Sequence, residues 1–385
     1  MLDAWFTWNA ALRLWITNTA GDDTKLADLH TAGHDIWGRQ AEPLSWANLT
    51  GNICSLNMTG WGEDRMRNMM WKQLAQCRTL IMAFNDHKRT ETQLPNLEMD
   101  VSASWLGSHN PDHKLKWAHA PAPNRHIGGI SIAVHPALAR YAHAPEIGND
   151  SCLWGRWTGM ELQGHKRKFM IVATYGPTEN TDEEATHSMW DTQTKLMEKL
   201  PRHERMQNPR LQYMHDLQQY LRKLKGDGYQ VILIGDTNIN LFKDNPTMTT
   251  SKSNMWQSHM HNVLDAWWPS LRSQRATWAS GHNTSYVDHI YATTAILQSG
   301  AIKAVGIEKP GIFYKSDHNM IGVYVNFTTL LGRTEGLPPL YKPRTRVVKS
   351  SIKENKEAYR AIAIKRDEAH QKKKSGLVHW VRPLT

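Results

Sequence analysis

The sequence is poor in cysteine and has no long apolar run. Its 385 residues include three cysteines, Cys54, Cys77 and Cys152, and no two of them form a CxxC pair. Three cysteines cannot build a disulfide framework, and the usual spacing of a structural zinc site is missing. Charged or polar residues interrupt every stretch that approaches the roughly 20 apolar residues of a membrane-spanning helix. We therefore expect a protein of a reducing compartment that does not cross a membrane.

Most of the chain also has little excess positive charge, because the excess lies almost entirely in one terminal segment. The formal net charge is +10, but residues 341–385 alone hold 13 Lys and Arg against four Asp and Glu. A segment of this kind is drawn to a polyanion by the release of counterions, whatever the polyanion's sequence. The alternative is a solvated tail with no partner.

Short apolar runs and helical patterns alternate irregularly along the middle of the chain. This texture favours a layered α/β fold with sheets inside and helices outside. Prolines and a glycine near position 338 mark a linker, so we expect an extension at 1–48, a domain at 49–330, and a linker with the basic tail at 331–385. The runs rich in β-branched residues predict strands at Ile53–Leu56, Leu80–Phe84, Gly129–Val134, Phe169–Tyr175, Gln230–Ile234, Tyr286–Tyr291 and Met320–Val325. The helical spacing of apolar residues predicts helices within 1–48, 66–77 and 214–224.

Polar side chains follow several of these strands. The apolar run that ends at Gly235 is followed by Asp236 and Asn238. In an extended backbone alternate side chains point to the same face, which suits a base with an orienting amide. The segments around Asp288 and His318 each place an aspartate beside a histidine, and an aspartate near an imidazole can hold it charged against a phosphate. Asn57 ends the first predicted strand in the same way.

In their order and spacing these motifs resemble the endonuclease/exonuclease/phosphatase superfamily. The resemblance runs from Asn52 to Phe327 and includes Tyr175-Gly-Pro, Gly235-Asp-Thr-Asn and Ser316-Asp-His. Within the superfamily, Leu56-Asn57, Gly128-Gly-Ile, Thr174-Tyr-Gly-Pro and Ser285-Tyr-Val-Asp-His-Ile look most like the endonuclease domain of non-LTR (LINE-type) retrotransposons. The resemblance implies a four-layered α/β/β/α sandwich and an Mg²⁺-dependent endonuclease that nicks DNA.

The resemblance also implies roles for individual residues. Asp236 matches the family's general base, and Asn238 lies beside it. His318 matches the imidazole that contacts the scissile phosphate, supported by Asp288, while Tyr175 would donate its hydroxyl to a phosphate oxygen. These roles fit what hydrolysis of a phosphodiester requires, namely an activated water and positive charge on the phosphate oxygens.

The family places an acidic metal ligand just after the strand that follows the first helix. Asp86 ends the strand Leu80–Phe84, whereas Glu91 reads more like the family's Glu-Thr dipeptide. We prefer Asp86 because the residues before Glu91 could not form a buried strand. Asn57 would complete the shell and Asp317 would be a further ligand, so the expected cofactor is Mg²⁺, with Mn²⁺ as a substitute.

One departure from the family bears on the substrate. Abasic-site repair endonucleases carry an aspartate two positions after the first-motif asparagine, where this chain has Thr59. The departure favours the retrotransposon branch over the repair branch. Candidate DNA contacts are two residues of the loop before the fifth motif, Ser285 within that motif, and three basic residues of the tail: Thr277, Trp278, Ser285, Lys372, Lys373 and Lys374.

In such retrotransposons the nick primes reverse transcription, so the resemblance implies DNA and a reverse transcriptase of the same element as partners. It also implies an intracellular, nuclear location, with no membrane partner. Two other functions stay open. One is a phosphatase or phospholipase acting on small or lipid phosphates, and the other is a decayed nucleic-acid-binding protein without catalytic activity.

Overall fold

The computed structural model describes residues 35–38, 49–60, 79–106, 114–145, 155–165, 167–178, 188–240, 256, 276–280, 283–308 and 316–332. The predicted helices within 1–48 and 66–77, and the three tail lysines Lys372, Lys373 and Lys374, lie outside these residues. The chain divides into two units, Met1–Pro338 and Pro339–Thr385, and everything described belongs to the first.

The larger sheet has seven strands. Their spatial order is β1 (Asp35–Gly38), β13 (Ile302–Glu308), β14 (Met320–Asn326), β2 (Thr50–Asn57), β3 (Thr79–Asn85), β5 (Ile130–Val134) and β4 (Lys116–Ala120). Neighbouring strands pair antiparallel except β2 and β3, which run parallel in the middle of the sheet.

The smaller sheet has five strands and repeats this plan. Their order is β12 (Asp288–Ala292), β9 (Tyr229–Asp236), β8 (Lys168–Tyr175), β7 (Trp157–Gln163) and β6 (Ala142–His143). Here β8 and β9 form the parallel pair. A short hairpin of β10 (Trp278–Ser280) and β11 (Asn283–Ser285) stands apart from both sheets.

The main core lies between the two sheets. Alternate residues of the central strands point into it, including Ile53 of β2 and Ile232 and Ile234 of β9. The residues of β9 that alternate with these isoleucines, Val231 and Leu233, point the other way and belong to a second core cluster with residues of α6. This alternation of side chains is what a strand buried on both faces produces.

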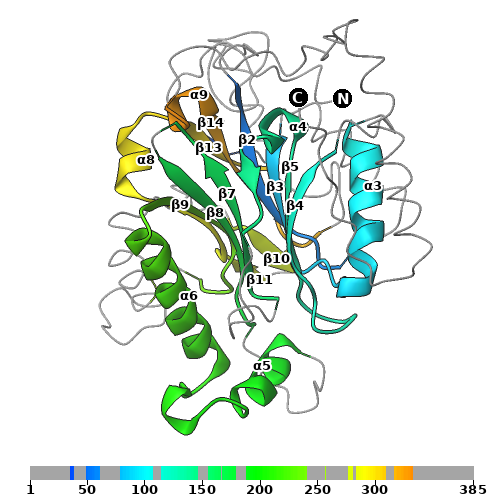
Figure 1. Cartoon of the computed structure of the whole chain (residues 1–385). Helices are drawn as coiled ribbons and strands as arrows, with labels where there is room; N and C mark the ends of the chain where they lie inside the picture. Colours follow the sequence, from blue (N-terminus) through cyan, green and yellow to red (C-terminus); the bar gives the residue numbers. More distant parts are fainter. Residues whose placement is uncertain are drawn as a thin grey trace, which may run out of the picture. The chain divides into compact units, whose positions relative to one another are not determined.

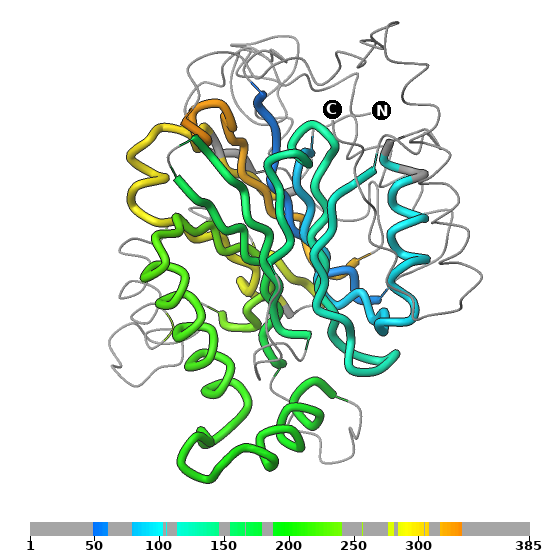
Figure 2. The backbone as a smooth tube through the Cα atoms, in the orientation of Figure 1, coloured from blue at the N-terminus to red at the C-terminus, as the bar shows by residue number. Residues whose placement is uncertain are grey.

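Helices cover the outer faces of the sheets. In Figure 1, α6 (Pro209–Gly226) lies beside the five-stranded sheet and α3 (Leu94–Leu106) beside the seven-stranded sheet, and Figure 2 traces the same order of layers. The structure thus confirms the predicted mixed α/β sandwich. Shorter helices are η3 (Glu91–Gln93), α4 (Pro136–Ala139), α5 (Met189–Met197), η5 (Arg202–Glu204), α8 (Thr294–Gln298) and α9 (Phe327–Leu330). No helix in the described part of the chain is long and apolar enough to span a bilayer.

Local sequence explains where α6 begins and ends. Asn208 caps the helix because its side chain accepts a hydrogen bond from Leu211 N at 3.0 Å, and Pro209 occupies the first turn, where its missing N–H costs nothing. Lys223 and Lys225 lie in the last turn, where positive charge offsets the helix dipole. The predicted helix at 214–224 lies inside α6 and is confirmed.

Each predicted strand overlaps an observed strand. β2 begins at Thr50, three residues before the predicted Ile53, and β12 begins two residues later than predicted. Tyr286–Tyr291 was predicted, but β12 begins at Asp288. The preceding residues do not join the ladder, because the N–H groups of Val287 and Asp288 both donate to Thr277 Oγ1, at 3.0 and 3.1 Å.

Gly235 on β9 lies close to the backbone of Thr174 on the paired strand β8. Its φ is +143°, and a Cβ at this position would lie 2.2 Å from the carbonyl oxygen of Thr174. We predict that Gly235→Ala lowers the free energy of unfolding by roughly 2–4 kcal/mol, because the backbone must shift to accept a methyl group. Urea denaturation followed by tryptophan fluorescence measures the change.

Gly226→Ala is the matched control. Gly226 ends α6, and a Cβ there meets no atom within 4 Å. The same substitution should therefore leave stability unchanged or raise it by up to about 1 kcal/mol, the helix propensity difference between the two residues. Equal destabilisation by both variants would contradict the close approach at Gly235.

Candidate active site

The two parallel strand pairs bring their carboxyl ends together. Asn57 ends β2 and Asp86 follows β3 in one sheet, while Tyr175 and Asp236 end β8 and β9 in the other. The Asn57 amide donates from Nδ2 to Asp236 Oδ2 at 2.8 Å, so one hydrogen bond joins the ends of the two sheets. Residues separated by 179 positions in sequence therefore meet at a single buried point.

Asp236 is fully buried and accepts hydrogen bonds on both oxygens. Oδ2 receives the Asn57 amide, and Oδ1 receives the backbone N–H of Asn238 at 2.8 Å. Burial raises the pKa of Asp236 well above its usual 3.8, and the nearby Asp288 carboxylate raises it further, against the opposing charge of His318. A carboxyl group with a raised pKa is a stronger base once it is ionised, as abstraction of a proton from water requires.

The imidazole of His318 lies between two aspartates. Its Nδ1 is 2.9 Å from Asp288 Oδ2, and its Nε2 is 3.8 Å from Asp236 Oδ2. Burial alone would lower the pKa of His318, but the Asp288 and Asp236 carboxylates outweigh it and raise the pKa to about 9. His318 is therefore a cation at neutral pH, with a proton on each ring nitrogen.

Asn238 is placed differently from the prediction. We expected it to follow Asp236 along an extended strand, but β9 ends at Asp236 and Asn238 adopts a left-handed φ of +54°. Its N–H turns back to Asp236, and its Nδ2 donates to the carbonyl oxygen of Gly176 at 2.7 Å. Asn238 thus fixes the Asp236 carboxylate and ties it to the end of β8, a local turn that asparagine adopts more readily than most residues.

Asp86 is the acid that reaches this site. It is buried, its Oδ1 accepts the N–H of Gly128 at 2.7 Å, and its Oδ2 lies 3.4 Å from Lys88 Nζ. Burial raises its pKa to about 6 although Lys88 acts in the opposite direction. Glu91, in contrast, is exposed on η3. Of the two acids, Asp86 is the buried one, and it lies within electrostatic range of His318.

Asp317 lies at the rim of the site with both oxygens engaged. Thr59 donates its hydroxyl to Oδ1 at 3.2 Å, and the Trp278 indole donates to Oδ2 at 2.7 Å. Thr59 is therefore a hydrogen-bond donor at the position where repair enzymes of the family carry an acid. Trp278, which is predicted to contact DNA, is partly exposed, and its indole nitrogen donates to this carboxylate.

Ser316 is a residue that sequence reasoning missed. Its hydroxyl donates to the Asn57 carbonyl at 2.7 Å and accepts the N–H of His318 at 3.0 Å, so it links the ends of two motifs. The signal that could have found it is its place at the head of the Ser-Asp-His motif, where a serine can cap the turn that follows.

The loop before β12 is tied to the start of that strand by hydrogen bonds to Thr277. Thr277 is fully buried, and its hydroxyl accepts the N–H groups that precede and begin β12. Thr277 was predicted to contact DNA; its side chain is fully buried, and its only polar side-chain atom is engaged with the backbone of Val287 and Asp288. Ser285, on β11 opposite Trp278, is half-buried.

Tyr175 lies within the electrostatic influence of the acids. Its side chain is buried, and burial raises its pKa well above the usual 10, with the Asp86 and Asp236 carboxylates adding to the effect. The hydroxyl therefore keeps its proton at every physiological pH and can act only as a hydrogen-bond donor toward an anion.

The oxygen-rich end of the site fits a hard divalent cation. Mg²⁺ takes oxygen ligands, one or two carboxylates and several waters, and Asp86 with Asn57 supplies oxygens of this kind beside a charge that burial leaves poorly compensated. The ligand atoms of Asp236, Asp288 and His318 also lie within 4.8 Å of one another. In the metal-free protein these three side chains are held by contacts with one another, and a metal ion could use His318 only by displacing a proton from its ring.

Comparisons with known proteins come from a family model and from solved structures. The Endonuclease/Exonuclease/phosphatase family model matches residues 49–318. The 3'-5' exonuclease NExo from Neisseria meningitidis is 16% identical, over 71% of this chain and 99% of its own, with a TM-score of 0.47. The endonuclease domain of TRAS1, a telomere-specific non-LTR retrotransposon, is 11% identical over 72% and 98%, with a TM-score of 0.47. An AP endonuclease from Archaeoglobus fulgidus is 14% identical over 72% and 99%, with a TM-score of 0.48. A search of curated protein sequences gives no match.

The charge on His318 gives a prediction for the metal-free protein. The imidazole should titrate near pH 9, staying protonated below that pH and losing its proton as the pH rises through it. Because Asp288 is the main cause that raises this pKa, Asp288→Asn should move the midpoint from about 9 toward the ordinary 6.5.

The measurement is an NMR titration of the histidine ring nitrogens in the full-length protein with chelator. Asp191→Asn is the control, because it removes a carboxylate from α5 that pairs with Lys195 and plays no part in the site. A midpoint that Asp288→Asn leaves in place would show that the pair does not hold the imidazole charged.

Proposed function

The chain belongs to the endonuclease/exonuclease/phosphatase family, and we propose that it is a metal-dependent phosphodiesterase that nicks DNA. The observation that carries this proposal is one buried array. The Asn57 amide holds Asp236 at 2.8 Å, and Asp288 holds the His318 imidazole at 2.9 Å, with His318 Nε2 3.8 Å from Asp236. A fixed base and a fixed cation thus face the same small space.

The base in this mechanism is Asp236. Its two oxygens are oriented by Asn57 and by the backbone of Asn238, so the carboxylate keeps one position while it accepts a proton from the attacking water. Orientation of this kind lowers the barrier because the geometry is established before the reaction begins. General-base catalysis by a positioned carboxylate contributes roughly 10²–10⁴-fold in rate.

Positive charge and neutral donors would hold the phosphate. The His318 imidazolium can donate a charge-assisted hydrogen bond to a non-bridging oxygen, while Asp288 keeps the ring charged and aligned. Tyr175 can donate its hydroxyl to another oxygen. A divalent cation bound at Asp86 and Asn57 would supply further positive charge where negative charge develops on the phosphate and the leaving group.

DNA is the substrate we propose because of the resemblance to retrotransposon endonucleases and because the rim of the site is basic. Lys88, Arg89 and Arg125 line a pocket beside Asp86. By the same resemblance, we propose that the nick primes a reverse transcriptase of the same element.

We predict that the purified full-length protein nicks supercoiled plasmid with Mg²⁺ or Mn²⁺ and loses this activity with chelator. Asp236→Asn should lower the nicking rate about 10²–10⁴-fold, because the shape is kept and the base is lost. Asp86→Asn should raise the Mg²⁺ concentration needed for half-maximal activity. Gel quantification of nicked circles measures each effect.

The matched control is Glu91→Gln, which removes an exposed carboxylate from the same segment. It should nick as the unaltered protein does. Equal loss on Glu91→Gln and Asp86→Asn would contradict the placement of the metal. Magnesium-independent DNA binding without nicking would favour the decayed binding protein, and release of phosphate from phosphomonoesters or phosphoinositides without nicking would favour the phosphatase.

A further inference from the structure

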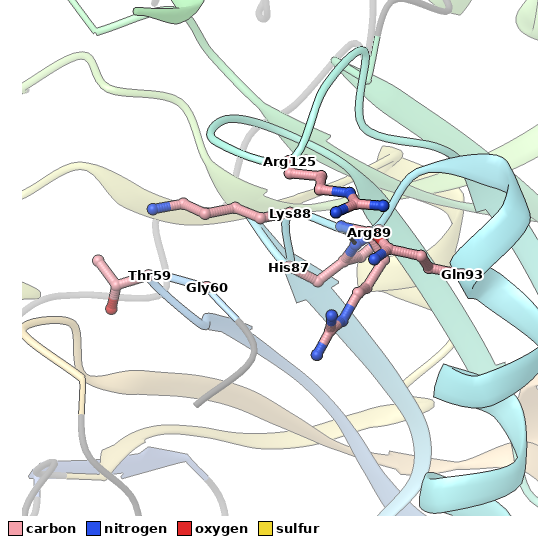
Figure 3. A pocket seen from close by; sticks show the side chains of 7 residues that line it. All are labelled: Thr59, Gly60, His87, Lys88, Arg89, Gln93 and Arg125. Carbon is pink, nitrogen blue, oxygen red and sulfur yellow. Dashed lines mark hydrogen bonds between the residues drawn. The ribbon is translucent and has the colours of Figure 1, made fainter. Parts of the chain in front are cut away.

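A basic pocket opens beside the candidate active site. Its volume is about 310 Å³, and Figure 3 shows the side chains that line it: Thr59, Gly60, His87, Lys88, Arg89, Gln93 and Arg125. Three of these residues are cationic and none is acidic. Pockets for drug-sized molecules are lined mostly by apolar and aromatic side chains, so this composition indicates an anion instead.

Backbone hydrogen bonds hold the two walls of the pocket together. Lys88 N donates to the Gly128 carbonyl at 2.9 Å, and Ala122 N donates to the Arg89 carbonyl at 2.9 Å. These bonds fasten the segment that carries Lys88 and Arg89 to the loop that carries Arg125. In Figure 3 the Arg125 side chain accordingly extends from its own loop over the segment that carries Arg89.

A chain of hydrogen bonds that runs from buried His87 to partly exposed Glu98 supports the floor of the pocket. His87 Nε2 is 2.9 Å from Ser131 Oγ, which is 2.7 Å from His119 Nδ1, and His119 Nε2 is 2.9 Å from Glu98 Oε1. On its other nitrogen, His87 accepts the N–H of Arg89 at 3.0 Å. The backbone below the cations is therefore ordered before any ligand arrives, which reduces the entropic cost of binding.

Two of the three cations are available to a ligand. Lys88 Nζ is engaged with Asp86 at 3.4 Å. Within the described part of the chain, no carboxylate lies at ion-pair distance from the guanidinium of Arg89 or Arg125. A guanidinium presents paired N–H donors that match the oxygens of a phosphate, so Arg89 and Arg125 each offer a phosphate-binding group to the pocket.

We propose that this pocket binds the phosphate next to the scissile phosphate on the DNA strand being cut. The proposal rests on the proposed function and adds a subsite to it. Two of the lining residues also contact acids of the candidate active site: Lys88 contacts Asp86, and Thr59 contacts Asp317. The pocket therefore adjoins the candidate active site. Arg89 and Arg125 then position the strand, and the uncut neighbouring phosphate sets which bond reaches His318.

The first test measures DNA binding without cleavage. A fluorescent duplex is titrated with full-length protein in chelator over a range of salt concentrations, for the unaltered protein, Arg89→Gln, Arg125→Gln and the double variant. Each single change should weaken binding about tenfold, the effect of losing a charge-assisted contact, and should reduce the slope of log K against log salt by about one. Arg222→Gln, which removes an exposed charge from α6, should change neither quantity.

The second test neutralises the DNA instead of the protein. Duplexes carry a single uncharged methylphosphonate at the phosphate on one side or the other of the cleaved bond, or at a distant position. At one adjoining position the replacement should weaken binding about tenfold to the unaltered protein but not to the double variant, because the partner of that phosphate is already gone. Circular dichroism and the exposed position of Arg125 separate this effect from unfolding.

Two results overturn the subsite. One is an equal loss on methylphosphonate substitution in the unaltered protein and in the double variant. The other is an Arg125→Gln slope that matches Arg222→Gln. Neither readout requires cleavage, so the subsite can stand if no nicking is found, and nicking can stand if the subsite is absent.

Discussion

The hydrogen bond between the Asn57 amide and the Asp236 carboxylate is the contact on which the site depends. It is the point where the ends of both parallel strand pairs touch, and both partners are almost wholly buried. A buried charged acceptor that loses its donor carries the full cost of its desolvation, so the two sheets are held at one relative position by chemistry as well as by their apolar core. Ile53, Ile232 and Ile234 belong to the same core cluster between the sheets, so the apolar core and the hydrogen bond that orients the base fix the same relative position of the two sheets.

Acidic groups outnumber cationic groups at the site when no ligand is bound. Asp86, Asp236 and Asp288 are buried, while His318 is the buried cation that faces them and Lys88 is half-buried at the edge. The pKa of Asp86 is raised to about 6 because the loss of hydration on burial outweighs the attraction of Lys88 for its negative charge. Stability is given up at this place, as is common where a fold must receive charge from a ligand. A cation and a phosphate together would complete the balance that the protein alone leaves open.

The sequence predicts the strands and the polar residues at their ends because both follow from short-range patterns. β2, β8 and β9 are runs of apolar residues bounded by a polar residue, and that pattern survives folding. Strands such as β7 and β13 escaped prediction because Gly159, Glu161 and Lys303 interrupt their apolar pattern, and the neighbouring strands decide their pairing. The left-handed turn at Asn238, the burial of Thr277 and the basic pocket were out of reach for a related reason. The turn depends on a hydrogen bond from Asn238 to distant Gly176, and the pocket on one from Lys88 to distant Gly128. Thr277 is held both by nearby Val287 and Asp288 and by distant Asn319.

The hairpin of β10 and β11 is joined to the site by more than its neighbours in sequence. Ala279 N donates to the Asp317 carbonyl, Asn319 N donates to the Thr277 carbonyl, and Trp278 forms a bridge with His318. The segment Asp317–Asn319, which carries the imidazole, is thus held against the hairpin by one β-bridge and two backbone hydrogen bonds. The position of the His318 ring is therefore fixed from two directions, by the Asp288 carboxylate at its Nδ1 and by the backbone of the hairpin on either side of it.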